Sequence, residues 1–167
     1  VCVMPVPADA PTPPAAHSRR GKPAGRWAYT DATGAVCFYH DRYEPKGERK
    51  QFSPVTLWRL PDGRMQWQFK APPAPRPLLG LPELAAKPGP VVIVEGEKAR
   101  DAAVTLFPEN PVITWQGGAQ AVSKAYWSPL SGRECWLWPD NDPAGEKAVR
   151  DVAAALATVN AEKVAVF

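Results

Sequence analysis

Carboxylates follow two apolar segments of the sequence at the points where those segments end. Glu95 comes directly after the β-branched run Val91–Val94, while Asp140 and Asp142 follow an apolar segment at 134–138. Because Asp140 and Asp142 are two residues apart, their side chains point the same way on an extended backbone. Carboxylates held close together repel one another unless a cation neutralises them, and ligands that are all oxygen favour Mg²⁺ or Mn²⁺. Glu95, Asp140 and Asp142 are therefore candidate ligands for Mg²⁺, with Mn²⁺ as its substitute.

The elements that must position these residues are predicted by the hydrophobic periodicity of residues 91–167. Short apolar runs alternate with amphipathic segments, which indicates a mostly parallel sheet covered by helices. The predicted strands lie at 91–94, 112–115, 134–138 and 163–167, and the predicted helices at 97–107, 119–125 and 144–157. Stripes at helical spacing predict the buried faces of the first and last helix, namely Ala99, Ala102, Ala103 and Leu106, and Val149, Val152, Ala153 and Leu156.

All three carboxylates fall at the carboxyl ends of predicted strands, where open α/β sheets bind their ligands. Neighbouring strands are ~4.8 Å apart, so Glu95 and the Asp140/Asp142 pair can converge if their strands are adjacent or nearly so. Each acid also has a structural interpretation: Asp142 as an N-cap before Pro143, Asp140 as a turn residue, and Glu95 as a charge that complements a helix N-terminus. The stability of the fold does not require three acids at one edge of the sheet, which favours the interpretation of these residues as metal ligands.

Residues 26–70 have a different texture, with short strand-like segments separated by turn residues, and they predict a small antiparallel sheet. Cations interleave with aromatic residues along it: Arg42, Lys46, Arg49, Lys50, Arg59 and Arg64 among Tyr39, Tyr43, Phe52, Trp58 and Trp67. This pattern suits single-stranded nucleic acid, because bases stack on rings while Lys and Arg contact phosphates. The alternative is that the rings form the core of the sheet and the cations its solvated face.

Prolines and charges divide the chain. Of the 21 prolines, six lie in residues 1–25 and seven in residues 72–90. We therefore expect an extended, partly ordered arm at 1–25, a β-rich basic subdomain with a Pro-rich joint at 26–90, and an α/β domain at 91–167 that is truncated at its C-terminal end. Residues 1–90 hold thirteen Lys and Arg against seven Asp and Glu, whereas residues 91–167 hold seven against ten. A basic half suits binding of a polyanion, and an acidic half suits binding of a cation; the alternative is that both are solvated surface charge.

The composition also excludes several classes of protein. So many prolines exclude an all-helical bundle, and 45% hydrophobic with 22% charged residues exclude a disordered chain. No apolar run approaches the ~20 residues that span a bilayer, so we expect no membrane partner. The first residues lack the pattern of a signal peptide, and the three widely spaced cysteines predict reduced thiols, so the expected location is cytoplasmic.

Three motifs resemble the TOPRIM domain, the catalytic fold shared by primases, topoisomerases and related nucleases. They are V-V-I-V-E-G-E at 91–97, T-W-Q-G-G at 114–118 and D-N-D-P-A-G at 140–145. Their order and spacing agree over 91–167. The E-G-E and D-x-D-x-A-G forms resemble the TOPRIM domains of bacterial, phage or mobile-element primases and primase-helicases more than those of topoisomerases. Residues 26–84 resemble the N-terminal part of such primases.

This resemblance implies a catalytic core that makes RNA primers on a single-stranded DNA template from ribonucleoside triphosphates, with a helicase domain or subunit as a further partner. By resemblance, Asp140 and Asp142 would hold Mg²⁺, and Glu95 would be a general base or an additional ligand. Lys98 and Lys124 would meet the triphosphate, although a solvated surface lysine is the commoner case for a residue of this type. The template would lie on the cations of the basic sheet, which are Arg42, Lys46, Arg49, Lys50 and Arg64.

The sequence departs from the family pattern at one position. Many primases carry an acid four residues after the first glutamate, where this chain has Ala99, and Asp101 would lie on a different face of the helix. A zinc module, usual in primases, is expected outside residues 1–167, so the isolated fragment could lack activity. Two alternatives stay open: a metal-dependent nuclease of the TOPRIM class, and a non-catalytic module that binds single-stranded DNA during replication.

Overall fold

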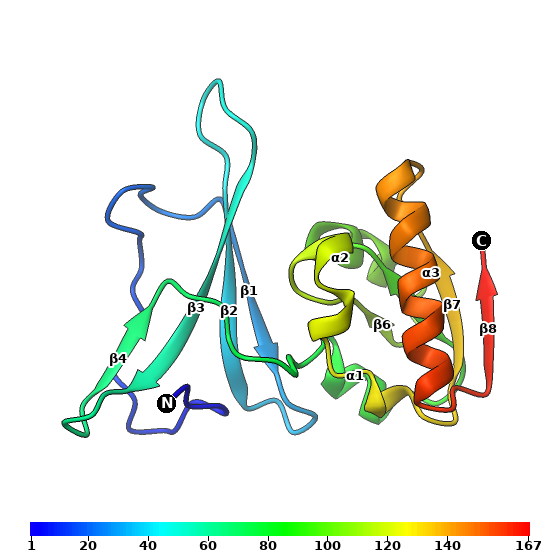
Figure 1. The fold of residues 1–167 in the computed structure, drawn as a ribbon, viewed down its shortest axis with the longest axis horizontal. Coiled ribbons are helices and arrows are strands. Elements are labelled where there is room, and N and C mark those ends of the chain that lie inside the picture. Colours follow the sequence, from blue (N-terminus) through cyan, green and yellow to red (C-terminus); the bar gives the residue numbers. More distant parts are fainter. The chain divides into compact units, whose positions relative to one another are not determined.

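Two separate sheets organise the chain (Figure 1). The computed structural model describes all of residues 1–167, and it divides into an N-terminal unit of Val1–Asp31 with Ala35–Pro73 and a C-terminal unit of Ala32–Gly34 with Ala74–Phe167. The N-terminal sheet contains β1 (Gly25–Thr30), β2 (Val36–Tyr43), β3 (Gln51–Arg59) and β4 (Met65–Gln68). These strands are antiparallel and pair in chain order, as the turn residues between them predict. None of the helices in the structure is long and apolar enough to span a bilayer.

The start of the segment predicted as an extended, partly ordered arm (1–25) hydrogen-bonds to this sheet. Strand β3 pairs with β2 over Gln51–Val55 and with β4 over Thr56–Arg59. On the side away from β4, the last residues of β3 therefore have backbone groups that can pair with the N-terminus of the chain. Val3 N donates to Leu57 O at 2.8 Å, and Arg59 N donates to Val1 O at 2.8 Å. The sequence could not reveal this order, because it comes from backbone hydrogen bonds with a strand more than fifty residues away.

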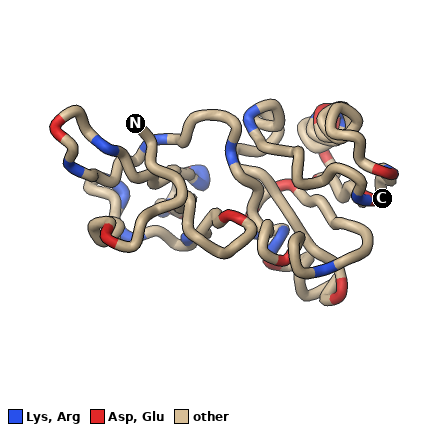
Figure 2. The backbone as a smooth tube through the Cα atoms, turned by 90° about the horizontal axis from the view of Figure 1, so that it is seen from below, with Lys and Arg blue, Asp and Glu red and all other residues tan.

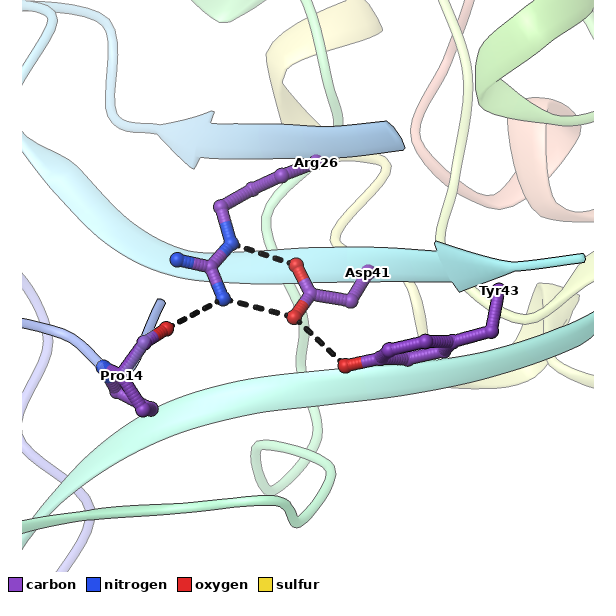
Figure 3. Close-up of polar contacts among 4 residues, drawn as sticks. All are labelled: Pro14, Arg26, Asp41 and Tyr43. Atoms are coloured by element: carbon purple, nitrogen blue, oxygen red, sulfur yellow. Dashed lines mark hydrogen bonds and ion pairs between the residues drawn. The ribbon is translucent and has the colours of Figure 1, made fainter. Parts of the chain in front are cut away.

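A buried ion pair ties the arm to the sheet (Figure 3). Arg26 donates from Nε to Asp41 Oδ1 at 2.6 Å and from Nη2 to Asp41 Oδ2 at 2.8 Å, and Nη2 also donates to Pro14 O at 2.8 Å. The Asp41 side chain is fully buried. Tyr43 donates its hydroxyl to Asp41 Oδ2 at 3.0 Å, and burial together with this hydrogen bond raises the pKa of Tyr43 to about 12. One carboxylate therefore organises an arginine, a tyrosine and the arm.

The C-terminal unit is the predicted α/β structure. Its strands β5 (Val91–Val94), β6 (Val112–Ile113), β7 (Glu134–Trp138) and β8 (Lys163–Val166) are all parallel and lie in the order β6-β5-β7-β8. Helices α1 (Leu81–Ala86) and α3 (Pro143–Thr158) pack on one face of this sheet, and α2 (Glu97–Leu106) packs on the other. The predicted fold class is confirmed: a mostly parallel sheet flanked by helices, preceded by a small antiparallel sheet.

Two local predictions in this unit are wrong. Residues 119–125 form two 3-10 turns, Gly118–Gln120 and Val122–Lys124, rather than a helix, because glycines in the left-handed conformation at 117 and 118 interrupt a regular helical backbone. The buried face of α2 also differs from the predicted stripe. Ala103 is buried, but Ala99, Ala102 and Leu106 are exposed. The sheet face is covered by Ala103 and by Phe107, which directly follows the helix, so only one residue of the predicted stripe is on the buried side.

The stripe predicted for the last helix is confirmed. Val152 and Leu156 are buried in the core of the C-terminal unit, and Val149 and Ala153 pack against it. The difference from α2 has a physical reason. The stripe predicted for α3 contains the large apolar residues Val149, Val152 and Leu156, whereas three of the four residues in the stripe predicted for α2 are alanines, which give a weak hydrophobic signal.

We predict that Asp41→Ala destabilises the protein by about 3 kcal/mol, because it leaves the guanidinium of Arg26 without its partner in a partly buried position. Urea unfolding followed by tryptophan fluorescence measures the loss. The matched control is Asp62→Ala, which breaks an exposed pair with Arg64 at 2.8 Å and should change the free energy of unfolding far less. Equal losses in the two variants would contradict a structural role for Asp41.

Candidate active site

Strand pairing brings the segments that carry the three carboxylates to one edge of the parallel sheet. Strands β5 and β7 are neighbours, and Val94 is the register partner of Trp138. Glu95 therefore leaves β5 at the level where the chain enters Pro139 and Asp140. The sequence required these strands to be adjacent or nearly so, and the structure makes them adjacent. A narrow cleft at this edge is lined by Glu95, Pro139 and Gly145, among others.

The loop after β6 holds Glu95. Ala119 N donates to Glu95 Oε1 at 3.0 Å, and Gly96 N donates to Thr114 Oγ1 at 2.9 Å. Gly117 and Gly118 have φ of 99° and 61°, in the left-handed region that favours glycine. A Cβ on Gly118 would lie 3.3 Å from Glu95 Oε1. The T-W-Q-G-G motif is thus a close turn that lets a backbone amide reach and orient the carboxylate of the first motif.

The D-N-D-P-A-G motif is a tight turn into α3. Asp142 N donates to Asp140 O at 2.9 Å, and Asp142 Oδ1 accepts from Gly145 N at 2.8 Å, which makes Asp142 the N-cap with Pro143 at the first helical position. A Cβ on Gly145 would lie 2.1 Å from Asp140 O, so only glycine permits this approach. The structural interpretation of Asp142 is therefore real, and it uses one of the two carboxylate oxygens.

The chemistry of these residues fits a hard cation, since all three offer carboxylate oxygens at one rim. Glu95 is half-buried, and Asp140 and Asp142 are exposed. No group of three or more His, Cys, Asp or Glu side chains is gathered closely enough in this structure to hold a metal ion. The donor type and the strand ends therefore agree with Mg²⁺, while the ligand set itself stays a prediction.

The two lysines predicted to meet nucleotide lie on segments that follow the same sheet edge. Lys98 is exposed in the first turn of α2, three residues after Glu95. Lys124 is exposed at the end of the second 3-10 turn, where its carbonyl accepts from Arg76 N at 2.7 Å. Lys98 thus follows closely on the end of β5, whereas Lys124 lies further along the chain from the end of β6, and the role of both stays a prediction.

Sequence reasoning missed Arg76, which reaches the loop that holds Glu95. Arg76 Nη1 donates to Gln116 Oε1 at 2.6 Å, and Gln116 is buried. Burial lowers the pKa of Arg76 from its ordinary value. Because Arg76 lies among four prolines, the sequence predicts only a Pro-rich joint in this segment. Its only sequence signal is an isolated cation directly before the apolar segment that leads into α1.

The cations predicted to bind nucleic acid divide into two groups in the N-terminal unit. Arg42 forms an ion pair with Glu44 at 2.5 Å, and Arg64 forms one with Asp62 at 2.8 Å. Lys46, Arg49 and Lys50 are exposed in the loop between β2 and β3. Among the aromatic residues, Tyr43 is buried, whereas Phe52 is exposed and stacks on His40 with ring centroids 5.3 Å apart. Nucleic-acid binding by these cations stays a prediction.

The fold to be compared is thus a parallel sheet in the order β6-β5-β7-β8, with acids at the ends of its two central strands, preceded in the chain by an antiparallel sheet. Comparison with solved structures finds the same fold in primases. The primase fragment of the bacteriophage T7 primase-helicase superposes with a TM-score of 0.54 and 21% identity, over 84% of this chain and 51% of that chain. The resemblance to TOPRIM-containing primases is thus confirmed at the level of the fold.

A second similar chain comes from a bacteriophage T7 complex, in which the lagging-strand DNA polymerase interacts with primase domains of two gp4 subunits bound to an RNA/DNA hybrid and dTTP. It matches with a TM-score of 0.50 and 21% identity, over 84% of this chain and 63% of that chain. The present chain thus spans about half to two thirds of the length of these chains. No family model and no curated protein matches the sequence.

The N-cap at Asp142 gives a prediction about stability that is independent of function. Asp142→Ala should destabilise the protein by about 1 kcal/mol, because the Gly145 amide loses its acceptor. Asp142→Asn keeps a side-chain oxygen there and should cost only a few tenths of that amount. Urea unfolding of both variants provides the measurement, and an asparagine variant as unstable as the alanine variant would contradict the capping role.

Proposed function

We propose that this chain is the catalytic core of a DNA primase, which synthesises RNA primers on single-stranded DNA by Mg²⁺-dependent nucleotidyl transfer. The observation that carries the proposal is the pairing of β5 with β7, which sets Glu95 beside the turn of Asp140 and Asp142 within a fold shared with a primase fragment. Ribonucleoside triphosphates are the substrates, and a helicase domain or subunit is the expected partner in the cytoplasm.

In this proposal the three carboxylates divide metal binding and proton transfer between them. A bound Mg²⁺ would supply the positive charge that stabilises the transferred phosphoryl group. Asp140 and Asp142 would supply its carboxylate ligands. Glu95, oriented by the amide of Ala119, would accept the proton of the attacking hydroxyl or add a ligand. The turn at 140–145 fixes the Asp142 carboxylate against the N-terminus of α3, so that little reorganisation is needed when the cation binds.

The cations would hold the two polyanionic substrates. Lys98 and Lys124 would contact the triphosphate of the nucleotide. Template would lie on the N-terminal unit, where Arg42, Lys46, Arg49, Lys50 and Arg64 are the candidate contacts. Contacts of this kind go to phosphates and therefore position a strand without reading its sequence.

The test measures both metal binding and catalysis with the whole chain. Asp140→Asn and Asp142→Asn should each lower primer synthesis at least ~100-fold, because removing a charge next to the transferred phosphoryl group removes transition-state stabilisation. Labelled ribonucleotides, a single-stranded template and Mg²⁺ report the product lengths on a gel. Titration with Mn²⁺ followed by electron paramagnetic resonance reports the metal independently and should show loss of affinity in both variants.

Asp151→Asn is the matched control, since Asp151 is a carboxylate of α3 that pairs with Lys147 on the helix surface. It should leave primer synthesis and Mn²⁺ binding unchanged. Products shorter than the added strand would instead identify a nuclease that uses the same carboxylates. Tight DNA binding with neither Mn²⁺ binding nor products would favour a non-catalytic module, and full activity in both aspartate variants would overturn the site.

The contact between Gly118 and Glu95 gives a second prediction. Gly118→Ala and Gly132→Ala place alanine at φ of 61° and 68°, so each should cost about 1 kcal/mol of stability. Only Gly118→Ala puts a Cβ 3.3 Å from Glu95 Oε1, whereas a Cβ on Gly132 meets nothing within 4 Å. We expect Gly118→Ala alone to lower primer synthesis, by roughly 10-fold. Equal activity in the two variants would show that the loop does not position Glu95.

A further inference from the structure

A groove of about 460 Å³ lies in the N-terminal unit, between the turn at residues 17–22 and the adjoining ends of β2 and β3. The residues around it that matter here are Arg19, Arg20, Lys22, Tyr43, Glu48 and Gln51. Three of them are cations from the arm, which the sequence motifs leave without a role. The groove is therefore a separate feature from the carboxylate site of the C-terminal unit.

The turn that carries these cations is held in place by backbone hydrogen bonds and by ring contacts with the sheet. His17 and Gly21 exchange two backbone hydrogen bonds of 2.9 Å, and Gly21 has a φ of 72°, which favours glycine. The ring of His17 packs on Phe69 with centroids 4.3 Å apart, and lies edge-on to Tyr43 at 6.1 Å. Arg19, Arg20 and Lys22 thus project from a turn that is anchored to the sheet.

Arg20 is oriented by side chains of the groove. Its Nε donates to Gln51 Oε1 at 3.0 Å, and its Cζ lies 5.7 Å from the centroid of the Tyr43 ring. Gln51 in turn donates from Nε2 to Glu48 Oε2 at 3.0 Å. A guanidinium held in this way loses less conformational entropy when it contacts an anion. Arg19 and Lys22 are exposed beside it.

Charge around the groove is strongly positive. The loop between β2 and β3, which contributes Pro45 and Glu48 to the lining, adds three exposed cations, namely Lys46, Arg49 and Lys50. Of the two acids there, Glu44 is paired with Arg42 and Glu48 accepts from Gln51. The whole N-terminal unit holds eleven Lys and Arg against six Asp and Glu (Figure 2). Such a surface attracts a polyanion.

The groove offers charges and no free aromatic face. Tyr43 is only 3% exposed, and its ring is already contacted by Arg20 and His17. Bases therefore have no ring on which to stack, whereas phosphates have three cations to meet. Contacts of this composition bind the backbone of a strand without regard to its sequence.

We propose that this groove binds the sugar-phosphate backbone of single-stranded DNA through Arg19, Arg20 and Lys22. The identity of the strand rests on the proposed primase function, whereas its polyanionic nature rests on the groove itself. The arm is thereby a DNA-binding element and adds to the cations that the sequence suggested.

The experiment measures binding of fluorescein-labelled (dT)20 to the whole chain by fluorescence anisotropy, over a series of salt concentrations and without metal or nucleotide. Arg19→Gln and Lys22→Gln remove exposed charges without disturbing the contacts of Arg20. Each should reduce the slope of log K against log salt by about 0.7 and weaken binding about fivefold at 0.1 M salt, and the double variant should add the two effects.

Arg150→Gln is the matched control, because Arg150 is an exposed cation of α3 in the C-terminal unit and has no proposed binding role. It should leave the slope and the affinity unchanged. Wild-type affinity in the double variant, or an equal loss in Arg150→Gln, would overturn the proposal. Asp140→Asn should bind (dT)20 normally, so a failure of the catalytic proposal is distinguishable from a failure of this one.

Discussion

The parallel pairing of β5 with β7 is the constraint on which the candidate site depends. Parallel strands bring their carboxyl ends to the same edge, and the register of Val94 with Trp138 sets Glu95 level with the approach to Asp140. A shift of one residue in either strand would also turn buried valines toward the opposite face. Residues of Val91–Val94 point alternately into the apolar clusters on the two faces of the sheet. This alternation fixes the register of β5, and with it the position of Glu95 at the end of the strand.

Around that edge, small residues let backbone approach carboxylate. Gly118 leaves room for Glu95 Oε1, and Gly145 leaves room for the carbonyl of Asp140. The amides of Ala119 and Gly145 then orient Glu95 and Asp142. Gly118 and Gly145 are thus favoured because a side chain there would crowd Glu95 or collide with the Asp140 carbonyl. The two amides stabilise the carboxylates by donating hydrogen bonds to them. The loop that contains Gly118 is also held by Arg76, which donates a hydrogen bond to the buried side chain of Gln116.

The N-terminal unit is organised by a different device, a buried carboxylate. Asp41 holds Arg26 and Tyr43, and Arg26 holds the arm through Pro14 (Figure 3). Once the arm is fixed, the turn at 17–22 can be built on Phe69 and Tyr43, and its cations face the groove. The ion pair of Arg26 with Asp41 therefore helps to fix the position of the arm. Because the arm is fixed, its exposed cations are held in place beside the groove.

The sequence by itself determined the fold class, the strand positions and the motifs, because long apolar runs, turn residues and acids at strand ends are local patterns. Only the tertiary structure decided that β5 and β7 are neighbours, that Ala119 binds Glu95 and that Arg76 reaches Gln116. It also decided that Arg42 and Arg64 are paired, that Ala103 is the buried residue of the predicted α2 stripe, and that Val1 and Val3 hydrogen-bond to β3. Each of these depends on which distant segments meet, and no local pattern carries that information.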